Sequence, residues 1–413
     1  MFDLEKLGRT AKEMSQYMAR LATVKKNEAL LACADALVAQ TEFILVQNAQ
    51  DMAAANPSRT AFNDRLRLDA TRIKGMADGL RKVARLDDPI NEVLYMKTLP
   101  NGLQIGERRT PLGVVGMIYE ARPNVTVDAM GLCFKSGNAC ILRGGSEALA
   151  SNIALVKVLQ EALASAGHPP QAVQLITDTS REVARDFMQL NAYIDVLIPR
   201  GGAGLIKTVM EHSRIPVIET GVGNCHIFVD ASADTQKAID IIINAKTQRP
   251  GVCNACEKLL IHASIADVFL PQICNVLAQA GVEIRGDAAT CKRFTKAIPA
   301  TDADWYEEYL SLIIAIKVVA DIDEAIAHIS QYSSAHSDAI LTASYTDARR
   351  FVAEVDSAAV YVNASTRFTD GEEFGLGAEM GISTQKLHAR GPMGLKALTS
   401  TKFIIFGDGQ IRG

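Results

Sequence analysis

The sequence predicts an α/β protein with two units, each built on a mostly parallel sheet. From residue 114 onward, short apolar runs alternate with helical patterns, as expected of strands joined by crossover helices. A first series of this kind runs from 114 to 221, and a second series begins at 222. With 413 residues, 48% of them hydrophobic, the chain is long enough to bury the cores of two or three structural units.

Outside these two series, the sequence predicts a helical region, a hairpin and a last strand. Leu, Ala and Met recur among charged residues from about 4 to 85, which is a helical pattern. Residues 94–108 form two alternating runs around a Pro-Asn-Gly turn and predict a β-hairpin. The segment 401–413 predicts a strand with little of its own to pair with. Because unpaired apolar strands aggregate, we expect the hairpin and this tail to contact another subunit.

Composition and charge exclude several classes of partner. The 43 basic and 47 acidic residues give a net charge of -4, so no basic surface is expected to gather nucleic acid. The N-terminus lacks the pattern of a signal peptide, and no apolar run approaches the ~20 residues that span a bilayer. Eight scattered cysteines in such a chain indicate thiols rather than disulfides. We therefore expect a cytoplasmic protein that acts on a small molecule, with neither nucleic acid nor a membrane as partner.

Two glycine turns lie between a predicted strand and a predicted helix. They are residues 143–146 (RGGS) and residues 200–204 (RGGAG). Neither matches the G-x-G-x-x-G dinucleotide pattern, and the chain has no P-loop motif. Glycine lets backbone amides approach a phosphate, and the N-terminus of the next helix favours an anion. The turns therefore suit phosphate binding, although ordinary tight turns have the same composition.

Cys253 lies in a predicted loop between a helix and a strand. The segment 247–254 interrupts apolar runs with Pro-Gly, which predicts an exposed loop. A thiol there, close to amide donors and to Arg249, is a candidate nucleophile, because such surroundings lower a thiol pKa and favour the thiolate. A loop cysteine without a function is the alternative.

Cys256 forms a C-x-x-C pair with Cys253, which admits two other interpretations. Structural zinc requires a second pair of ligands at suitable spacing, and Cys225 and His226 lie far upstream in an apparent strand. A redox dithiol should open a helix, whereas the EKLLIH segment after Cys256 predicts a strand. We expect no metal site and assign Cys256 no role.

The chain resembles the aldehyde dehydrogenase superfamily in four motifs that occur in the order expected for it. These are PLGVVGMIYEARPN, ILRGGSEA, VIETGVGN and the cysteine loop. Three C-terminal segments, 323–340, 359–384 and 385–395, resemble more narrowly the γ-glutamyl phosphate reductase family. The resemblance runs over nearly the whole chain. It implies an aldehyde dehydrogenase-like fold with two Rossmann-like α/β domains and a small β oligomerisation element.

The resemblance also implies a division of the chain and a set of partners. Residues 1–96 and 114–221 would form the NADP-binding domain and residues 222–395 the catalytic domain. Residues 97–113 and 396–413 would form the oligomerisation hairpin and tail. The family resemblance implies a homodimer or homotetramer, and a transient contact with glutamate 5-kinase, which makes the acyl phosphate substrate.

The activity implied by the resemblance is an NADPH-dependent reduction in proline biosynthesis. L-Glutamate 5-phosphate would be reduced to L-glutamate 5-semialdehyde and phosphate through a cysteinyl thioester. One alternative is another thioester-forming aldehyde dehydrogenase that acts on an acyl-CoA or a free aldehyde. An alternative of a different class is a non-catalytic scaffold protein, since fold alone does not give function. The presence of Cys253, Glu219 and Glu308 together favours an enzyme.

The resemblance assigns Cys253 as nucleophile, with Glu219 at the spacing of the glutamate of that superfamily. Glu219 has two open roles, since it could tune or deprotonate Cys253 or cap a turn. The sequence departs from the superfamily at 119–123, where Ala121 occupies the place of the oxyanion-hole asparagine. The expected donors are then the Cys253 backbone amide and Asn124.

Cofactor and substrate residues also follow from the resemblance. Arg143 and Ser146 would lie near the adenosine ribose, where they suit the 2′-phosphate of NADPH, and Glu308 would hold the nicotinamide ribose; a solvated charge at the end of a strand is the alternative for Glu308. The full set of expected cofactor residues is Arg143, Gly144, Gly145, Ser146, Glu147, Gly201, Gly202 and Glu308. The substrate is an anion, so cations and hydroxyls in the site segments are expected to bind it. These are Arg122, Arg249, Ser365, Thr366 and Arg367.

Overall fold

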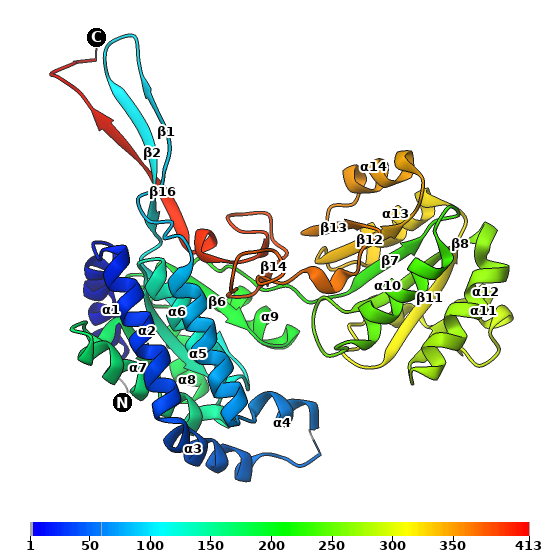
Figure 1. Ribbon diagram of the computed structural model, residues 1–413, viewed down its shortest axis with the longest axis horizontal. Helices are drawn as coiled ribbons and strands as arrows, with labels where there is room; N and C mark the ends of the chain where they lie inside the picture. The colour runs from blue at the N-terminus through cyan, green and yellow to red at the C-terminus, as the bar shows by residue number, and fades with distance from the viewer. Residues whose placement is uncertain (1–2, 59, 413) are drawn as a thin grey trace. The chain divides into compact units, whose positions relative to one another are not determined.

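The structure is a computed structural model that describes residues 3–58 and 60–412 and divides into two units (Figure 1). Unit 1 contains the chain up to Thr220, together with Gly375–Gly381 and the residues from Met393 onward. Unit 2 contains Gly221–Phe374 and Ile382–Pro392. The predicted α/β architecture with parallel sheets is confirmed in both units.

Helices make up the N-terminal part of unit 1, as the repeated Leu, Ala and Met positions predict. They are α1 (Leu4–Met18), α2 (Thr23–Ala39), α3 (Thr41–Ala54), α4 (Thr60–Leu66) and α5 (Ala70–Arg85). The carboxylates of Asp3 and Asp69 cap α1 and α5 by accepting hydrogen bonds from the backbone N–H groups of Lys6 and Arg72. Within the described part of the chain, no single helix has the length and apolarity to cross a membrane, although α2 and α3 taken together as a bent pair do.

The sheet of unit 1 is parallel and has the order β5-β4-β3-β6. Its strands are β3 (Val114–Tyr119), β4 (Ala139–Gly144), β5 (Val173–Leu175) and β6 (Val196–Arg200), and its helices are α6 (Pro123–Lys135), α7 (Leu149–Ser165), α8 (Arg181–Phe187) and α9 (Ala203–His212). Every residue of β3 is buried, as required of a central strand covered on both faces. The IPVIETG segment, which the sequence predicts as a strand, contributes only an isolated bridge from Val217 to Leu197.

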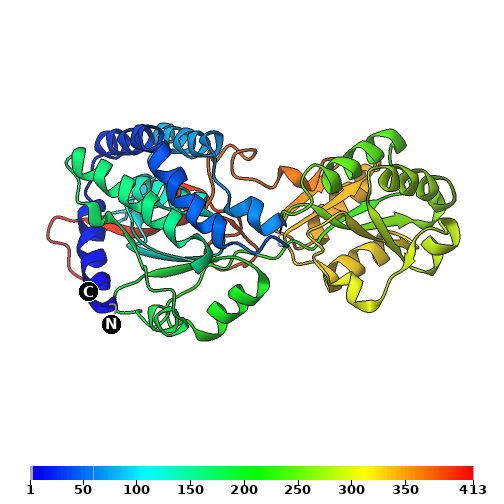
Figure 2. The ribbon, with the colours of Figure 1, turned by 90° about the horizontal axis from the view of Figure 1, so that it is seen from below.

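The sheet of unit 2 is also parallel and has the order β10-β9-β11-β8-β7-β12-β13. Its strands are β7 (Cys225–Val229), β8 (Cys256–His262), β9 (Glu283–Gly286), β10 (Ile298–Pro299), β11 (Ile313–Val319), β12 (Ser337–Leu341) and β13 (Ala359–Val362). Helices lie on both faces (Figure 2). They are α10 (Thr235–Thr247), α11 (Ala263–Gln279), α12 (Ala288–Arg293), α13 (Ile322–Tyr332) and α14 (Tyr345–Glu354).

Side-chain alternation along β7 explains how both faces of this sheet are filled. Ile227 and Val229 point into the core formed with α10 and α11. Phe228, between them, points into the core formed with α13 and α14. This period of two is the normal consequence of strand geometry. The apolar runs of this region are therefore continuous because each strand is buried on both faces.

The predicted hairpin is present, but the C-terminal strand behaves differently from the expectation. The strands β1 (Val93–Thr98) and β2 (Gln104–Pro111) form the hairpin, and Gly102, with φ of +87°, lies in its turn. β16 (Thr399–Phe406) pairs antiparallel with β2 along its whole length. The tail therefore has a partner strand in its own chain, and the expectation that it has little of its own to pair with is wrong. We call β1, β2 and β16 the hairpin sheet.

Candidate active site around Cys253

The Cys253 loop joins α10 to β8, as predicted. α10 ends at Thr247 and β8 begins at Cys256, and the Pro-Gly pair at 250–251 lies between them. The Cys253 side chain is half-buried, whereas Asn254, Ala255 and Cys256 are buried. Of the two thiols in the C-x-x-C pair, only that of Cys253 therefore reaches the surface of unit 2.

The Cys256 thiol is inert by comparison. It donates a hydrogen bond to the Lys258 carbonyl at 3.2 Å and has no exposed surface. Burial raises the pKa of Cys256 to about 12. A thiol that stays protonated at neutral pH is not a nucleophile. Cys256 is thus a core residue at the start of β8, and the strand predicted after it is confirmed.

Asn254 fastens the Cys253 loop to the turn at 365–369. Its side-chain amide donates to the carbonyls of Thr369 at 2.8 Å and Arg367 at 3.3 Å. Its own backbone carbonyl accepts from the Thr366 hydroxyl at 2.7 Å. A further hydrogen bond joins the Arg367 guanidinium to the Asn254 side-chain oxygen. The residue after Cys253 is therefore held on several sides.

Two guanidinium groups lie at this loop. Arg367 donates from Nε to the Gln248 side-chain oxygen at 2.9 Å, and Arg249 is exposed. Burial, and next the positive charge of Arg249, lower the pKa of Arg367, while the neighbouring Cys253 acts in the opposite direction. An arginine pair beside a thiol is suited to an anionic acyl substrate, because guanidinium binds phosphate or carboxylate through paired hydrogen bonds.

The hydroxyls of Ser365 and Thr366 are already engaged. Both residues are buried. The Ser365 hydroxyl accepts from the Arg367 backbone N–H at 3.3 Å, and the Thr366 hydroxyl donates to Asn254 as described. In this structure these two residues shape the loop, while the two arginines are the groups that an anion could reach.

Glu308 is held close to Cys253 through Gly223. One Glu308 carboxylate oxygen accepts from the Gly223 backbone N–H at 2.7 Å. Gly223 in turn packs against the Cys253 backbone so closely that a Cβ at this position would lie 1.6 Å from the Cys253 carbonyl oxygen. Only glycine fits this approach. Glu308 therefore belongs to the same cluster of residues as Cys253.

Three buried charges lie beneath the Glu308 loop. The Lys246 and Glu257 side chains form a fully buried ion pair at 2.9 Å, and Glu257 also accepts from the Leu310 backbone N–H at 3.3 Å. Lys258 donates to the Glu307 carbonyl at 2.7 Å and lies over the Tyr309 ring. Burial raises the pKa of Glu257 and lowers that of Lys258 to about 8. The segment 307–310 is thus anchored at two backbone groups.

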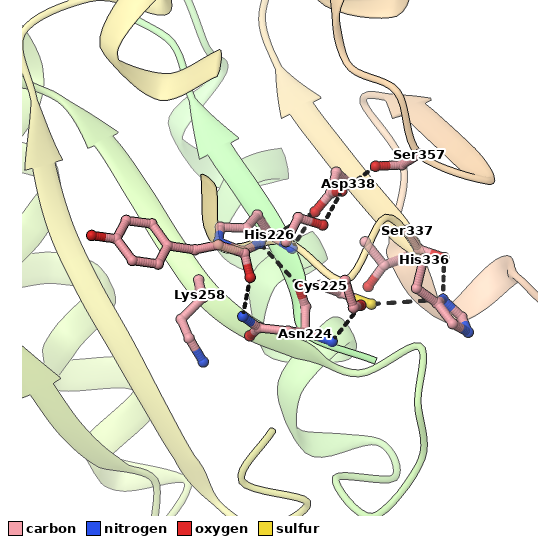
Figure 3. Close-up of polar contacts among 12 residues, drawn as sticks. Asn224, Cys225, His226, Lys258, His336, Ser337, Asp338 and Ser357 are labelled. Carbon is pink, nitrogen blue, oxygen red and sulfur yellow. Dashed lines mark hydrogen bonds and ion pairs between the residues drawn. The ribbon is translucent and has the colours of Figure 1, made fainter. Parts of the chain in front are cut away.

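A buried polar network around Cys225, His226 and Asp338 lies at the start of β7 (Figure 3). Gly223 and Cys225 contact the Cys253 backbone there. Asp338 accepts from the His226 backbone N–H at 2.7 Å and from the hydroxyls of Ser333 and Ser357. Burial alone would raise the pKa of Asp338, but the His226 side chain, together with the hydroxyls of Ser357 and Ser333, outweighs burial and lowers the pKa. The network fixes β7 to β12.

Unit 1 brings the two predicted glycine turns to one edge of its sheet. Residues 143–147 follow β4 and residues 201–202 follow β6, and the carboxyl ends of parallel strands share an edge. Ligands of open α/β sheets bind at this edge. Glu120, which follows β3, accepts from the Gly202 backbone N–H at 3.0 Å. An anionic oxygen thus already lies at the N-terminus of α9, as a phosphate would.

Arg143 has capacity for a ligand. Its guanidinium donates to the carbonyls of Thr179 and Ser180 at 3.1 and 3.0 Å, and burial lowers its pKa. Its Nε is buried and has no hydrogen-bond partner among the residues that the structure describes. Ser146 and Glu147 follow it, and Glu147 accepts from the Ala121 backbone N–H at 3.1 Å. Donors, acceptors and a cation at this edge fit a phosphorylated dinucleotide.

The remaining predicted residues also lie in unit 1. Arg122 is the N-cap of α6, and Asn124, in the first turn of α6, donates to the Asp128 carboxylate at 3.0 Å. Glu219 is half-buried just before the division between the units. The structure therefore groups Cys253 with Arg249, Glu308 and the 365–367 turn in unit 2. It groups Arg122, Asn124, Glu219 and the glycine turns in unit 1.

Several residues of the site were not predicted from the sequence. They are Asn254, which clamps the loop, the buried charges of Lys246, Glu257 and Lys258, the Cys225 thiol and Glu120. The sequence contains a sign of the buried charges, because Glu257 and Lys258 lie at the start of an apolar strand. Glu120 also stands directly after a buried strand, where ligand-binding polar residues are common.

Comparison with known proteins finds a matching family model and full-length relatives. A model of the aldehyde dehydrogenase family matches residues 3–290. The γ-glutamyl phosphate reductase of Carboxydothermus hydrogenoformans is 60% identical over 415 residues, which cover 100% of each chain. The crystal structure of γ-glutamyl phosphate reductase from Thermotoga maritima is 48% identical, covers 100% of both chains and has a TM-score of 0.97. An acetylating aldehyde dehydrogenase from Geobacillus thermoglucosidasius, at 15% identity and a TM-score of 0.72 over 100% of this chain and 98% of its own, shares the fold.

Proposed function

This chain belongs to the γ-glutamyl phosphate reductases within the aldehyde dehydrogenase family, and from that premise we propose that Cys253 is its catalytic nucleophile. The reaction is the NADPH-dependent reduction of L-glutamate 5-phosphate to L-glutamate 5-semialdehyde and phosphate, a step of proline biosynthesis. One observation carries the assignment. Cys253 combines a thiol that reaches the surface, two neighbouring guanidinium groups and a loop held rigid by Asn254.

The first half of the proposed mechanism is acyl transfer. The Cys253 thiolate attacks the carbonyl carbon of the acyl phosphate and forms a C–S bond. The bond from that carbon to the phosphate oxygen breaks, and phosphate leaves with the electron pair. The Cys253 backbone amide and Asn124 are the proposed donors to the oxyanion. Arg249 and Arg367 are the proposed partners of the substrate anions, with Arg122, Ser365 and Thr366 as further substrate residues.

The proposed cofactor residues lie at the edge of the unit 1 sheet, and Glu308 is the one cofactor residue proposed from unit 2. Arg143 and Ser146 would take the 2′-phosphate, the turns at 144–147 and 201–202 would lie against the remaining phosphates and ribose, and Glu308 would hold the nicotinamide ribose. The orphaned Arg143 Nε supports this placement. When bound, NADPH supplies the hydride that converts the thioester into the aldehyde.

Glu219 keeps two proposed roles. A hydrolytic aldehyde dehydrogenase needs a base that activates water, whereas a reductase must keep water from its thioester. Glu219 would then either assist deprotonation of Cys253 or cap the turn in which it lies. A Glu219→Gln variant separates them: a shift in the pH profile of Cys253 alkylation is expected of the first role, and an unchanged profile of the second.

The reverse reaction tests the proposal as a whole. Glutamate 5-semialdehyde should reduce NADP only when phosphate or arsenate is present, and Cys253→Ala should abolish this. Phosphate-dependent activity with NADP would support substrate, cofactor and thioester together. A preference for coenzyme A over phosphate would instead support an acyl-CoA reductase, and failure with every acceptor would favour a non-catalytic scaffold.

The proposal includes assembly and location. The hairpin sheet has open edges at β1 and β16 and exposes Met96, Phe403 and Ile405, which suits a homodimer or homotetramer. A transient contact with glutamate 5-kinase would protect the reactive acyl phosphate during transfer. No disulfide joins cysteines in the described residues, as suits a cytoplasmic compartment.

A further inference from the structure

A second thiol lies directly against the nucleophile. Cys225 is the first residue of β7 and is completely buried. Its Sγ donates to the Cys253 carbonyl oxygen at 3.1 Å. This contact joins residues that are far apart in sequence, and it bears on the backbone of the residue that carries the reactive sulfur.

The chemical state of Cys225 suits a donor. Burial raises the pKa of the Cys225 thiol well above its ordinary value, and the negative charge of Asp338 and the neighbouring Cys253 add to this. The S–H group is therefore present at any pH at which the enzyme would work. His336, whose Nδ1 lies 3.8 Å from the Cys225 Sγ and 2.8 Å from the Ser337 hydroxyl, is the other close polar neighbour (Figure 3).

The Cys253 carbonyl is fixed from two directions. The Cys225 thiol reaches its oxygen from β7, and Gly223 packs against the same oxygen, where a Cβ would lie at 1.6 Å. Gly223 itself is held by Glu308. Because a peptide group is planar, fixing this carbonyl fixes the plane that leads into Asn254. The orientation of the peptide plane on the C-terminal side of Cys253 is then determined.

The same network reaches the other side of the loop. The Ser337 hydroxyl lies 2.6 Å from that of Thr369, and the Thr369 carbonyl accepts from Asn254 at 2.8 Å. Polar contacts thus run from Cys225 through His336 and Ser337 to the clamp beyond the nucleophile. Such connected networks hold geometry better than isolated contacts.

We propose that Cys225 is a positioning residue for the nucleophile: its thiol holds the Cys253 carbonyl and so aims the Cys253 side chain at the substrate. The inference rests on the proposed function of Cys253. Cys225 itself touches neither substrate nor reacting atoms. Its contribution should resemble that of one neutral hydrogen bond to a group that must be well placed.

The chain supplies a matched control. Cys256 lies opposite Cys225 in the pairing of β7 with β8, and it is equally buried. Its thiol donates to the Lys258 carbonyl within its own strand instead of to Cys253. Substitutions of Cys256 therefore change core packing at the same depth without removing the contact to the nucleophile.

The test compares Cys225→Ala, Cys225→Val and Cys225→Ser with Cys256→Ala in the full chain. Val fills the space of the thiol without donating, and Ser restores a donor. The alkylation rate of Cys253 by iodoacetamide is followed across pH by mass spectrometry of the peptide that contains it. Turnover is measured in parallel, with separate kcat and KM values.

The alkylation rate of Cys253 should level off at a plateau at high pH, where the thiol is fully ionised. We expect Cys225→Ala and Cys225→Val to lower this plateau rate and kcat by about two- to tenfold, with little change in KM for NADPH. The pH midpoint should stay in place, Cys225→Ser should recover most of the rate, and Cys256→Ala should behave as the parent. If the Ala variant does not fold, the Val variant decides.

Unchanged plateau and kcat in the Val variant, or equal losses in the Cys225 and Cys256 variants, would overturn the inference. A moved midpoint with an unchanged plateau would also overturn it, because Cys225 would then act through charge. Cys253→Ala separates the two levels. If that variant keeps its turnover the proposed function fails, whereas alkylation of Cys253 reports on Cys225 without any turnover.

Discussion

The two units place their buried charges differently. In unit 1 they fasten helices: Lys26 pairs with Asp88 at 2.8 Å, and the Asp51 carboxylate accepts from the Ser151 backbone N–H at 2.8 Å. In unit 2 the pair of Lys246 and Glu257 lies next to the loops of the candidate site. The buried Asp338 carboxylate also lies next to these loops. Unit 1 thus has mainly backbone turns at its proposed cofactor edge, and unit 2 holds the Cys253 loop with buried side chains.

This difference has an energetic meaning. A buried charge is stable only when its partners are in place, and removing one partner typically costs several kcal/mol. Such groups confer geometry more than stability. The substitutions that matter for chemistry should therefore concentrate in the interior of unit 2, while unit 1 should be sensitive mainly at its ligand-facing edge.

The largest expected effect tests the unit 2 side of the comparison. Cys253→Ala should lower turnover by several orders of magnitude, because the covalent route is lost. Cys256→Ala should keep substantial activity, since its thiol is buried and protonated. Steady-state rates of both variants decide this. An inactive Cys256→Ala beside an active Cys253→Ala would reverse the assignment.

The next effect concerns the edge of unit 1. Arg143→Ala should raise the dissociation constant for NADPH by about ten- to a hundredfold, which corresponds to the loss of one charge-assisted contact. NADH, which lacks the 2′-phosphate, should lose much less. Titrations with both cofactors, monitored by nucleotide fluorescence, make the comparison. Equal losses would place the 2′-phosphate elsewhere.

The third effect is on the pH dependence of the free energy of unfolding, which should differ between the two units. His328 is buried in unit 2, edge-on to Trp305 at 5.3 Å, and burial lowers its pKa to about 3. The unfolded chain therefore binds a proton that the folded chain does not as pH falls from about 6.5, and the free energy of unfolding decreases. Between pH 6.5 and 5 the decrease is about 2 kcal/mol.

His328→Phe should remove this acid sensitivity while keeping the ring contacts. Urea unfolding at pH 7 and pH 5, followed by the fluorescence of the single tryptophan, Trp305, reports on unit 2. His168→Phe in unit 1 is the control, since burial also lowers the pKa of His168 but its ring bonds to Tyr17 at 2.9 Å. His168→Phe should leave the pH dependence reported by Trp305 as in the parent, and the idea is contradicted if His328→Phe also keeps it.

The last effect concerns the hairpin sheet, which lies outside the two parallel sheets of the comparison. Phe403 is 63% exposed on β16, and Phe403→Glu places a charge on the hairpin sheet. If this surface joins subunits, the variant should weaken self-association by about one to two orders of magnitude in concentration. Sedimentation velocity over a dilution series measures it. Lys402→Glu, on the same strand, controls for charge alone.

Local patterns predicted the parts of the molecule that depend on local physics. The strands around β3, the loop with Cys253 and the hairpin all follow from apolar periodicity and turn residues. Short elements with weak periodicity, such as β9, α12, β10 and α14, were not predicted. The strand expected at IPVIETG forms only one bridge, because Val217 pairs at the edge of the sheet.

The contacts that position the nucleophile could not be predicted in this way. Cys225 meets Cys253, Glu308 meets Gly223 and Asn254 meets Thr369 across long stretches of chain, so no local window contains both partners. The sequence predicts Lys258 only as part of an apolar strand. Its buried hydrogen bond could not be predicted, because the Glu307 carbonyl that accepts it comes close only in the folded chain. Sequence pattern and resemblance indicate the candidate nucleophile, whereas the contacts that hold it can be seen only in the tertiary structure.

The pairing of β16 with β2 has a consequence for synthesis on the ribosome. Unit 1 is discontinuous in sequence, and its hairpin sheet lacks an edge strand until Thr399–Phe406 has been made. Domains generally fold as they emerge, with the N-terminal one first. Here unit 2 emerges entirely before unit 1 is complete, so the nascent chain carries β2 unpaired on one side until β16 has emerged. A stalled or prematurely released chain would expose that strand to other nascent chains.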